Sequence, residues 1–301
     1  MSYLHHIFMK ERENFNRLTE EHLQKHPLPK DVTCVPDIPY LKDGNPVHCL
    51  DVYRCYPRFD DLKLPAIINI HGGGMIMGNK EFNRCFCGYL SRMGYVVFSL
   101  EYRLVPDVTV FEQLQDIADA MKFLEKIMSE YHADPEQVYM VGDSAGAWLS
   151  VYTLAMQKNP HIAQIAGVNP SFLNICALSL ISGMFYTTRR DSIGMFLPKY
   201  LYGSDYRHIE FTPYINPEHF EIAQSLPPCQ LITSKNDKWR SYSLDYAATL
   251  KQNGINCVLE DYDGGQELSH AFSVFHPELE RSQDVIRSIT DFLLINDKPN
   301  T

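Results

Sequence analysis

The segment Gly142-Asp143-Ser144-Ala145-Gly146 constrains the fold more than any other part of the chain. The apolar residues 138–141 before it are typical of a short buried strand, and residues 145–156 after it have the pattern of a helix. A serine with a glycine two residues away on either side can occupy a sharp strand-to-helix turn, which exposes its hydroxyl at the carboxyl edge of a sheet. We therefore predict that Ser144 is a nucleophile on an α/β scaffold.

Strands and helices are predicted to alternate on both sides of this turn. We expect strands at 47–53, 64–70, 95–100, 138–141, 177–181, 230–233 and 256–262, a helix beginning near 81, and further helices at about 111–131, 145–156, 243–252 and 285–293. Strand-helix-strand units build parallel sheets. The predicted fold class is therefore α/β, with a mostly parallel central sheet flanked by helices, and the turn around Ser144 favours the α/β-hydrolase fold within this class.

Two segments do not follow this alternation. The first forty residues begin with apolar residues at helical spacing, but Pro27, Pro29, Pro36 and Pro39 prevent a long helix from continuing. Residues from about 183 to 225 have mixed aromatic, Arg and Pro content without a clear period. We predict that residues 1–45 form an N-terminal helical arm. Together with an insertion after the sixth strand, at about 183–225, this arm would form a cap on a catalytic domain of residues 46–298.

A glycine-rich loop, His71-Gly72-Gly73-Gly74, follows the strand predicted at 64–70. Backbone N–H groups without side chains can approach an oxygen that becomes negatively charged during acyl transfer. We predict an oxyanion hole made by the amides of Gly73, Gly74 and Ala145. We expect His71 to anchor this loop and not to act as a base.

A serine hydroxyl is a weak nucleophile unless an imidazole accepts its proton and a carboxylate orients that imidazole. In this fold the order along the chain is Ser, acid, His. Asp237 follows the strand at 230–233, and His270 follows the last predicted strand, so we assign them as acid and base. The alternatives that remain are Asp245, Asp261 and Asp263 for the acid and His276 for the base.

The 301-residue chain has a formal net charge of -10 at pH 7, which argues against a nucleic-acid groove, because phosphate binding needs clustered Lys and Arg. Its N-terminal sequence does not resemble a secretory signal, and we find no run of about 20 uncharged apolar residues. We therefore expect a cytoplasmic protein without a membrane or nucleic-acid partner, acting on a small-molecule ester.

The eight cysteines are scattered, and we expect most to be buried free thiols. Cys85 and Cys87 form the only close pair, whereas zinc sites with this spacing contain two such pairs. We expect no metal and no cofactor.

The combination of motifs resembles the hormone-sensitive-lipase-like family of α/β-hydrolase carboxylesterases over about residues 45–295. The resemblance rests on the glycine loop with Gly78 behind it, the segment 102–107 (Tyr-Arg-Leu-Val-Pro-Asp), the turn around Ser144, Asp237 and His270. It implies hydrolysis of short acyl esters such as acetyl esters, through an acyl-enzyme and without a cofactor. It also implies a cap made from the N-terminal arm and inserted segments, and it is in keeping with a homodimer.

Four further side chains could line the substrate pocket: Met75, Phe185, Tyr186 and Trp239. Two departures from the family pattern, Ala147 in place of a usual glycine and Ser241 in place of a frequent acid, leave the three catalytic residues intact. The same scaffold serves amidases and formamidases, and a ligand receptor could retain the fold without catalysis. These alternatives stay open at the level of sequence.

Overall fold

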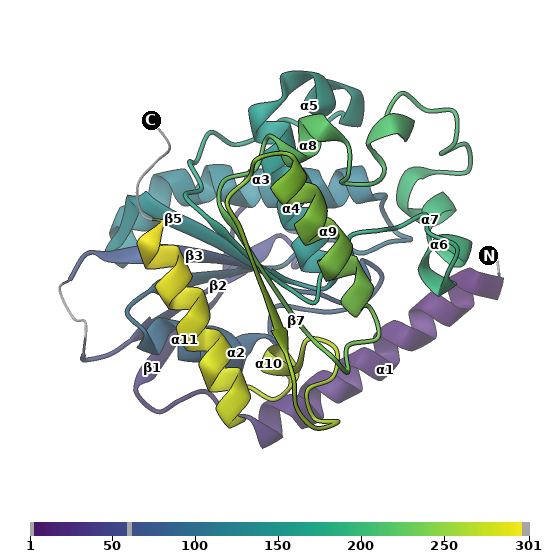
Figure 1. Ribbon diagram of the computed structural model, residues 1–301. Coiled ribbons are helices and arrows are strands. Elements are labelled where there is room, and N and C mark those ends of the chain that lie inside the picture. Colours follow the sequence, from purple (N-terminus) through teal and green to yellow (C-terminus); the bar gives the residue numbers. More distant parts are fainter. Residues whose placement is uncertain (1–2, 59–61, 297–301) are drawn as a thin grey trace.

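In the computed structural model, which describes residues 3–58 and 62–296, an eight-stranded sheet forms the centre of the molecule (Figure 1). Its order is β1-β2-β4-β3-β5-β6-β7-β8. The strands are β1 Val32–Pro39, β2 Cys49–Cys55, β3 Leu64–Ile70, β4 Val96–Leu100, β5 Ala133–Asp143, β6 Leu178–Ile181, β7 Cys229–Ser234 and β8 Cys257–Tyr262. Strand β2 is antiparallel to both of its neighbours, and all other neighbouring pairs are parallel. The predicted, mostly parallel sheet is confirmed.

Helices cover both faces of this sheet. The helices are α1 Tyr3–Lys25, α2 Arg84–Arg92, α3 Val110–Ile127, α4 Ala145–Lys158, α5 Pro160–Ala166, α6 Ser192–Phe196, α7 Pro198–Tyr202, α8 Phe220–Ala223, α9 Arg240–Gln252, α10 Phe272–Phe275 and α11 Glu280–Ile295, with 3-10 turns at Met128–Tyr131 and Thr212–Tyr214. Side chains of α3, α4 and α9 pack in one hydrophobic core, and side chains of α2, α10 and α11 pack in the other.

Successive residues of the central strands contribute to these two cores in turn. Ile68 and Ile70 of β3 lie in the core beneath α4, whereas Ile67 lies in the core beneath α11. This follows from the period of two in a strand, which points neighbouring side chains to opposite faces. Strands buried on both faces appear in the sequence as continuous apolar runs, which is why β3 matches its predicted bounds.

The largest difference from the predicted elements lies near the N-terminus. Helix α1 is longer than the short helix expected, and strand β1 was not predicted, because Pro36 and Pro39 were interpreted only as residues that end a helix. Strand β1 lies at the edge of the sheet and carries a register shift between Val35 and Ile38. Proline is tolerated at edges and bulges, where a missing N–H breaks no central ladder. The residues expected to form an arm therefore also contribute a strand to the sheet.

The carboxyl ends of the parallel strands gather at one edge, where the predicted site residues follow them. His71 comes directly after β3, Ser144 after β5 and Asp237 shortly after β7, while His270 follows β8. The segment after β6 contains α6, α7 and α8, and the start of α1 lies beside α6 and α7 (Figure 1). Among the described residues, no helix is long and apolar enough to span a membrane.

Candidate active site

Ser144 occupies a strained turn between β5 and α4. Its φ of 51° and ψ of -112° lie in a backbone region that residues other than glycine rarely adopt. A Cβ on Gly146 would lie 2.0 Å from the carbonyl oxygen of Ile70, and one on Gly142 would lie 2.6 Å from the carbonyl oxygen of Gly146. Both positions therefore require glycine for the strand, the turn and the helix to pack this closely.

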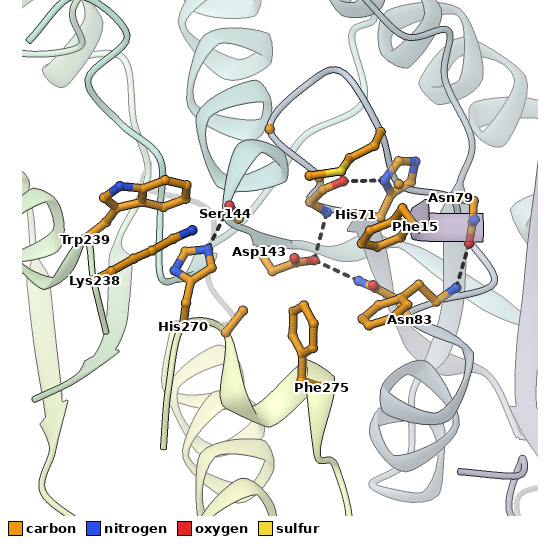
Figure 2. Close-up of a pocket in the computed structure, with 17 residues that line it drawn as sticks. Phe15, His71, Asn79, Asn83, Asp143, Ser144, Lys238, Trp239, His270 and Phe275 are labelled. Atoms are coloured by element: carbon orange, nitrogen blue, oxygen red, sulfur yellow. Dashed lines mark hydrogen bonds between the residues drawn. The ribbon is translucent and has the colours of Figure 1, made fainter. Parts of the chain in front are cut away.

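The structure brings the three predicted side chains of the proton relay together. Figure 2 shows two of them, Ser144 and His270. His270 Nε2 lies 3.0 Å from Ser144 Oγ, and His270 Nδ1 lies 2.8 Å from Asp237 Oδ1. Asp237 is oriented in turn by the backbone N–H of Trp239 at 2.9 Å and the hydroxyl of Thr233 at 3.2 Å. The imidazole thus bridges a hydroxyl and a carboxylate, as acyl transfer by a serine requires.

The protonation state of Asp237 suits this arrangement. Burial alone would raise its pKa, but the hydrogen bond and the charge of His270, together with hydrogen bonds from Trp239 and Ser182, outweigh burial and hold the pKa below its ordinary value. Asp237 is therefore a carboxylate at neutral pH and accepts the Nδ1 proton of His270. This tautomer leaves the lone pair of Nε2 facing the hydroxyl of Ser144.

The glycine loop lies against the turn that carries Ser144. Gly73 and Gly74 line the same cavity as Ser144 and have φ values of 113° and 62°, which favour glycine. The N–H of Gly72 donates to Asp143 Oδ1 at 3.1 Å. The amide of Ala145 opens α4, where the first N–H groups of a helix have no acceptor within the helix. All three predicted oxyanion donors thus belong to segments next to the nucleophile.

His71 holds the base of the glycine loop, as expected. Its Nδ1 lies 2.7 Å from the carbonyl oxygen of Gly72 and its Nε2 lies 3.0 Å from Glu101 Oε1, while Tyr102 stacks on its ring at 4.2 Å. Burial lowers the pKa of His71, but the carboxylate of Glu101 outweighs burial and raises the pKa above its ordinary value. Both nitrogens of His71 face oxygen atoms, so the ring is held on both sides and anchors the loop.

Asp143 is a second buried acid beside Ser144 whose role the sequence did not indicate. Its Oδ1 also accepts a hydrogen bond from the side-chain amide of Asn83 at 2.8 Å. Burial raises the pKa of Asp143 above its ordinary value. The carboxyl therefore joins the serine turn, the glycine loop and the segment before α2 into one unit.

A cavity of about 150 Å³ opens beside Ser144 and His270. Its apolar wall consists of Phe15, Met77, Phe82, Trp239 and Phe275, together with the glycine loop (Figure 2). The ring of Trp239 meets that of His270 edge to face, with centroids 4.7 Å apart. Phe15 comes from α1, Phe82 from the segment before α2, and Phe275 from α10. Segments so distant in sequence leave no local pattern that would reveal a shared wall.

Of the four side chains predicted for the pocket, the structure places only Trp239 in the wall of this cavity. Met75 is fully buried in the core on the α4 face. Phe185 packs on Tyr246 with ring centroids 4.4 Å apart, and the guanidinium of Arg189 lies over the ring of Tyr186. All three side chains are buried in the protein interior. Phe185 and Tyr186 pack against α9.

The alternative acids and base are engaged in other contacts. Asp245 pairs with Arg189 at 2.6 Å and Asp263 pairs with Lys235 at 2.5 Å. Asp261 forms a paired hydrogen bond with the guanidinium of Arg240, and His276 lies near His26. Asp237 and His270, in contrast, contact each other directly.

Comparison with known proteins agrees with this geometry. A family model described as the alpha/beta hydrolase fold matches residues 67–273. The chain is similar to a probable isoprenylcysteine alpha-carbonyl methylesterase of Oryza sativa subsp. japonica, with 28% identity over 73% of this chain and 55% of that protein. It is also similar to an acetyl esterase of Salmonella paratyphi B, with 22% identity over 75% of this chain and 70% of that protein.

Among solved structures, esterase B from Lactobacillus rhamnosis superimposes with a TM-score of 0.89, at 23% identity, over 96% of this chain and 94% of that chain. At this identity, the similarity establishes the fold. The chain spans about half the length of the plant methylesterases that it matches. The family match extends over more than half of the sequence and includes the serine turn, the glycine loop, Asp237 and His270. The chain therefore belongs to the hormone-sensitive-lipase-like family of α/β-hydrolases.

Proposed function

We propose that this chain is a serine carboxylesterase that hydrolyses short-chain acyl esters, such as acetyl esters. One observation carries the proposal: the continuous hydrogen-bonded relay from Ser144 through His270 to Asp237, with distances of 3.0 and 2.8 Å. The amides of Gly73 and Gly74 lie on the adjacent loop, where they can meet a developing oxyanion.

In the proposed reaction, Ser144 Oγ attacks the ester carbonyl carbon while His270 Nε2 accepts the hydroxyl proton. The negative oxygen is stabilised by the amides of Gly73, Gly74 and Ala145, and removal of one such donor typically costs about 3 kcal/mol. His270 then donates the proton to the departing alkoxide, which leaves an acyl-enzyme. A water molecule, deprotonated by the same imidazole, attacks the acyl carbonyl and releases the acid.

The size and lining of the cavity support a small substrate. Its volume of about 150 Å³ is below the range of about 300–1,000 Å³ typical of pockets that enclose drug-sized ligands. The aromatic wall favours an uncharged group beside the scissile bond. The similarity to the Salmonella acetyl esterase agrees with an acetyl or similarly short acyl group.

We also propose that helix α1, from the predicted arm of residues 1–45, and the insertion at 183–225 act together as the cap of the catalytic domain predicted at 46–298, of which residues 297 and 298, like residues 1 and 2 of the arm, lie outside the described residues. Two contacts support this: Phe15 of α1 lines the cavity, and Phe8 of α1 packs edge to face on Tyr200 of α7, with ring centroids 5.0 Å apart. The predicted homodimer and cytoplasmic location stay predictions, which sedimentation velocity and cell fractionation would test.

Labelling with a fluorophosphonate probe tests the nucleophile. The proposal predicts covalent labelling that is abolished in Ser144→Ala and unchanged in the control Ser129→Ala, whose serine is exposed on a distant 3-10 turn. Absence of labelling that depends on Ser144 would favour a non-catalytic ligand receptor.

Comparing turnover of p-nitrophenyl acetate with that of an N-formyl aromatic amine tests the bond that is cleaved. The esterase proposal predicts a higher kcat/KM for the acetate. A clear preference for the amide would instead identify an amidase or formamidase on the same scaffold.

A further inference from the structure

Three side chains far from Ser144 in sequence converge where α1 ends. His26 follows α1, and His276 and Glu278 lie between α10 and α11. Each offers one potential ligand atom, and these atoms all lie within 4.8 Å of one another. His26 Nδ1 lies 2.8 Å from Glu278 Oε2, and the rings of His26 and His276 have centroids 6.1 Å apart.

A third histidine lies beside this group. His22 lies one helical turn before His26, and their ring centroids are 4.6 Å apart. His22 is only 7% exposed, and its Nε2 is buried without a hydrogen-bond partner among the described residues. Burial of an unpaired polar nitrogen is costly, and a ligand bound by this nitrogen would offset that cost.

We propose that His26, His276 and Glu278 bind a divalent transition-metal ion of the zinc type, with His22 or water as the fourth ligand. Imidazole nitrogens combined with a carboxylate oxygen are a typical zinc ligand set. Metal–ligand distances of about 2.0–2.1 Å in a tetrahedron require ligand atoms roughly 3.4 Å apart. The carboxylate of Glu278, whose side chain is 46% exposed, is free to make that adjustment.

A second group of acids in the described structure, Asp37, Asp51 and Glu81, also meets the distance requirement for a metal site. The ammonium of Lys80 already contacts all three of these carboxylates and balances their charge. The histidine group is therefore the better candidate. The sequence analysis considered only Cys85 and Cys87 and expected no metal, because histidines at positions 26 and 276 form no local motif.

An ion at this place would join two walls of the candidate active-site cavity. His22 stacks on Phe82 with ring centroids 4.2 Å apart, and Phe275, next to His276, meets Phe82 edge to face at 4.8 Å. Both phenylalanines line the cavity. The ion would thus fix the end of α1 against the segment after α10, and it would stabilise the folded protein in proportion to its affinity.

Calorimetric titration of the tag-free, chelator-treated full chain with ZnCl₂ tests this site. We expect one equivalent of Zn²⁺ to bind, no comparable binding of Mg²⁺, and a higher Tm with Zn²⁺. Loss of an outer partner of a metal ligand typically weakens affinity about 10–100-fold, so His276→Ala and Glu278→Gln should each weaken it at least that much. The control His208→Ala, at an exposed histidine of the insertion, should not.

Zn²⁺ binding that is unchanged in both His276→Ala and Glu278→Gln would overturn the proposal, because the eight cysteines would then be the better explanation. Absence of any stoichiometric binding would also overturn it. Co²⁺ gives an independent readout, since a tetrahedral site with imidazole ligands produces visible absorption that both variants should remove. Ser144→Ala should bind Zn²⁺ like the unmodified chain, so this test stands apart from the proposed esterase activity.

Discussion

The two halves of the candidate site are held in different ways. The half that carries Ser144 and the glycine loop depends on backbone packed so closely that an added Cβ on Gly146 would lie 2.0 Å from a carbonyl oxygen. The half that carries Asp237 and His270 depends on side-chain hydrogen bonds, and its cavity wall depends on aromatic contacts of α1 and α10. The first half is therefore fixed by main-chain geometry and the second by exchangeable side chains.

The two halves of the site should therefore respond differently to substitution. Adding a side chain at Gly142 or Gly146 in the first half should destroy the fold, because backbone atoms cannot move away from a new Cβ without disrupting β3 and β5. Substitution in the second half should remove catalytic rate or binding while leaving the protein folded. Four changes, ordered from the largest expected effect to the smallest, test this distinction.

Gly146→Ala should prevent folding or destabilise the chain by more than about 4 kcal/mol, because its Cβ would collide with the backbone of Ile70. Gly44→Ala is the matched control. Gly44 has a φ of 76°, but a Cβ added there would have no other atom within 4 Å, so only strain of about 1–2 kcal/mol is expected. Denaturant unfolding measures both, and similar costs for the two variants would contradict the comparison.

Asp237→Asn should lower kcat by about 10⁴-fold, because an amide cannot hold His270 in the required tautomer. The side chains have nearly the same shape, so the far-ultraviolet circular dichroism spectrum should stay unchanged. Asp263→Asn is the control, since that carboxylate is 70% exposed and pairs with Lys235. Steady-state kinetics with p-nitrophenyl acetate decide the matter; equal rates for the two variants would exclude Asp237 as the acid.

Phe15→Ala should raise KM about tenfold with little change in kcat, because a lost apolar contact in a pocket is typically worth about 1–3 kcal/mol. Phe15 lines the cavity from α1, whereas Leu18 on the same helix is 40% exposed and does not. Leu18→Ala should therefore leave KM unchanged. A fall in kcat without a change in KM would show that α1 acts on the chemical step and not on binding.

The smallest effect concerns pH and the two buried carboxyls. The pKa of Asp237 is lowered in the folded chain, so its contribution to stability is present above its unfolded pKa near 3.8 and is lost as pH falls through the folded value. The pKa of Asp143 is raised, so its contribution is present below 3.8 and is lost as pH rises through the folded value.

Urea unfolding between pH 7 and pH 3.5 should show these opposite signs. The free energy of unfolding of the unmodified chain relative to Asp237→Asn should decrease as pH falls. Relative to Asp143→Asn it should increase. The same sign for both pairs would show that the two halves do not differ in how they hold a buried acid.

The first half of the site could be predicted from sequence because glycine positions report backbone geometry. Gly142 and Gly146 lie where the structure admits no Cβ, and the continuous apolar run of β3 reports burial on both faces. Strand β1 contains prolines, which a strand tolerates only at the edge of a sheet or at a bulge. It was missed because a sequence alone does not reveal which strand lies at the edge.

The second half was accessible only through chain order, and the cavity wall was not accessible at all. Asp237 and His270 were chosen because they follow late strands, not because of any local motif. Phe15, Phe82 and Phe275 meet only after the sheet has formed, so no periodicity links them. Met75, Phe185 and Tyr186 were predicted for the pocket because aromatic and apolar residues after strand ends suit a pocket and a core equally well.

A crystal structure of the chain inhibited by a short-chain phosphonate ester tests the central claim most directly. We expect a covalent bond from Ser144 Oγ to phosphorus, with the phosphonyl oxygen about 2.7–3.1 Å from the amide nitrogens of Gly73, Gly74 and Ala145. His270 should remain within hydrogen-bond reach of the serine oxygen. A phosphonyl oxygen directed away from the glycine loop, or an imidazole turned away from position 144, would contradict it.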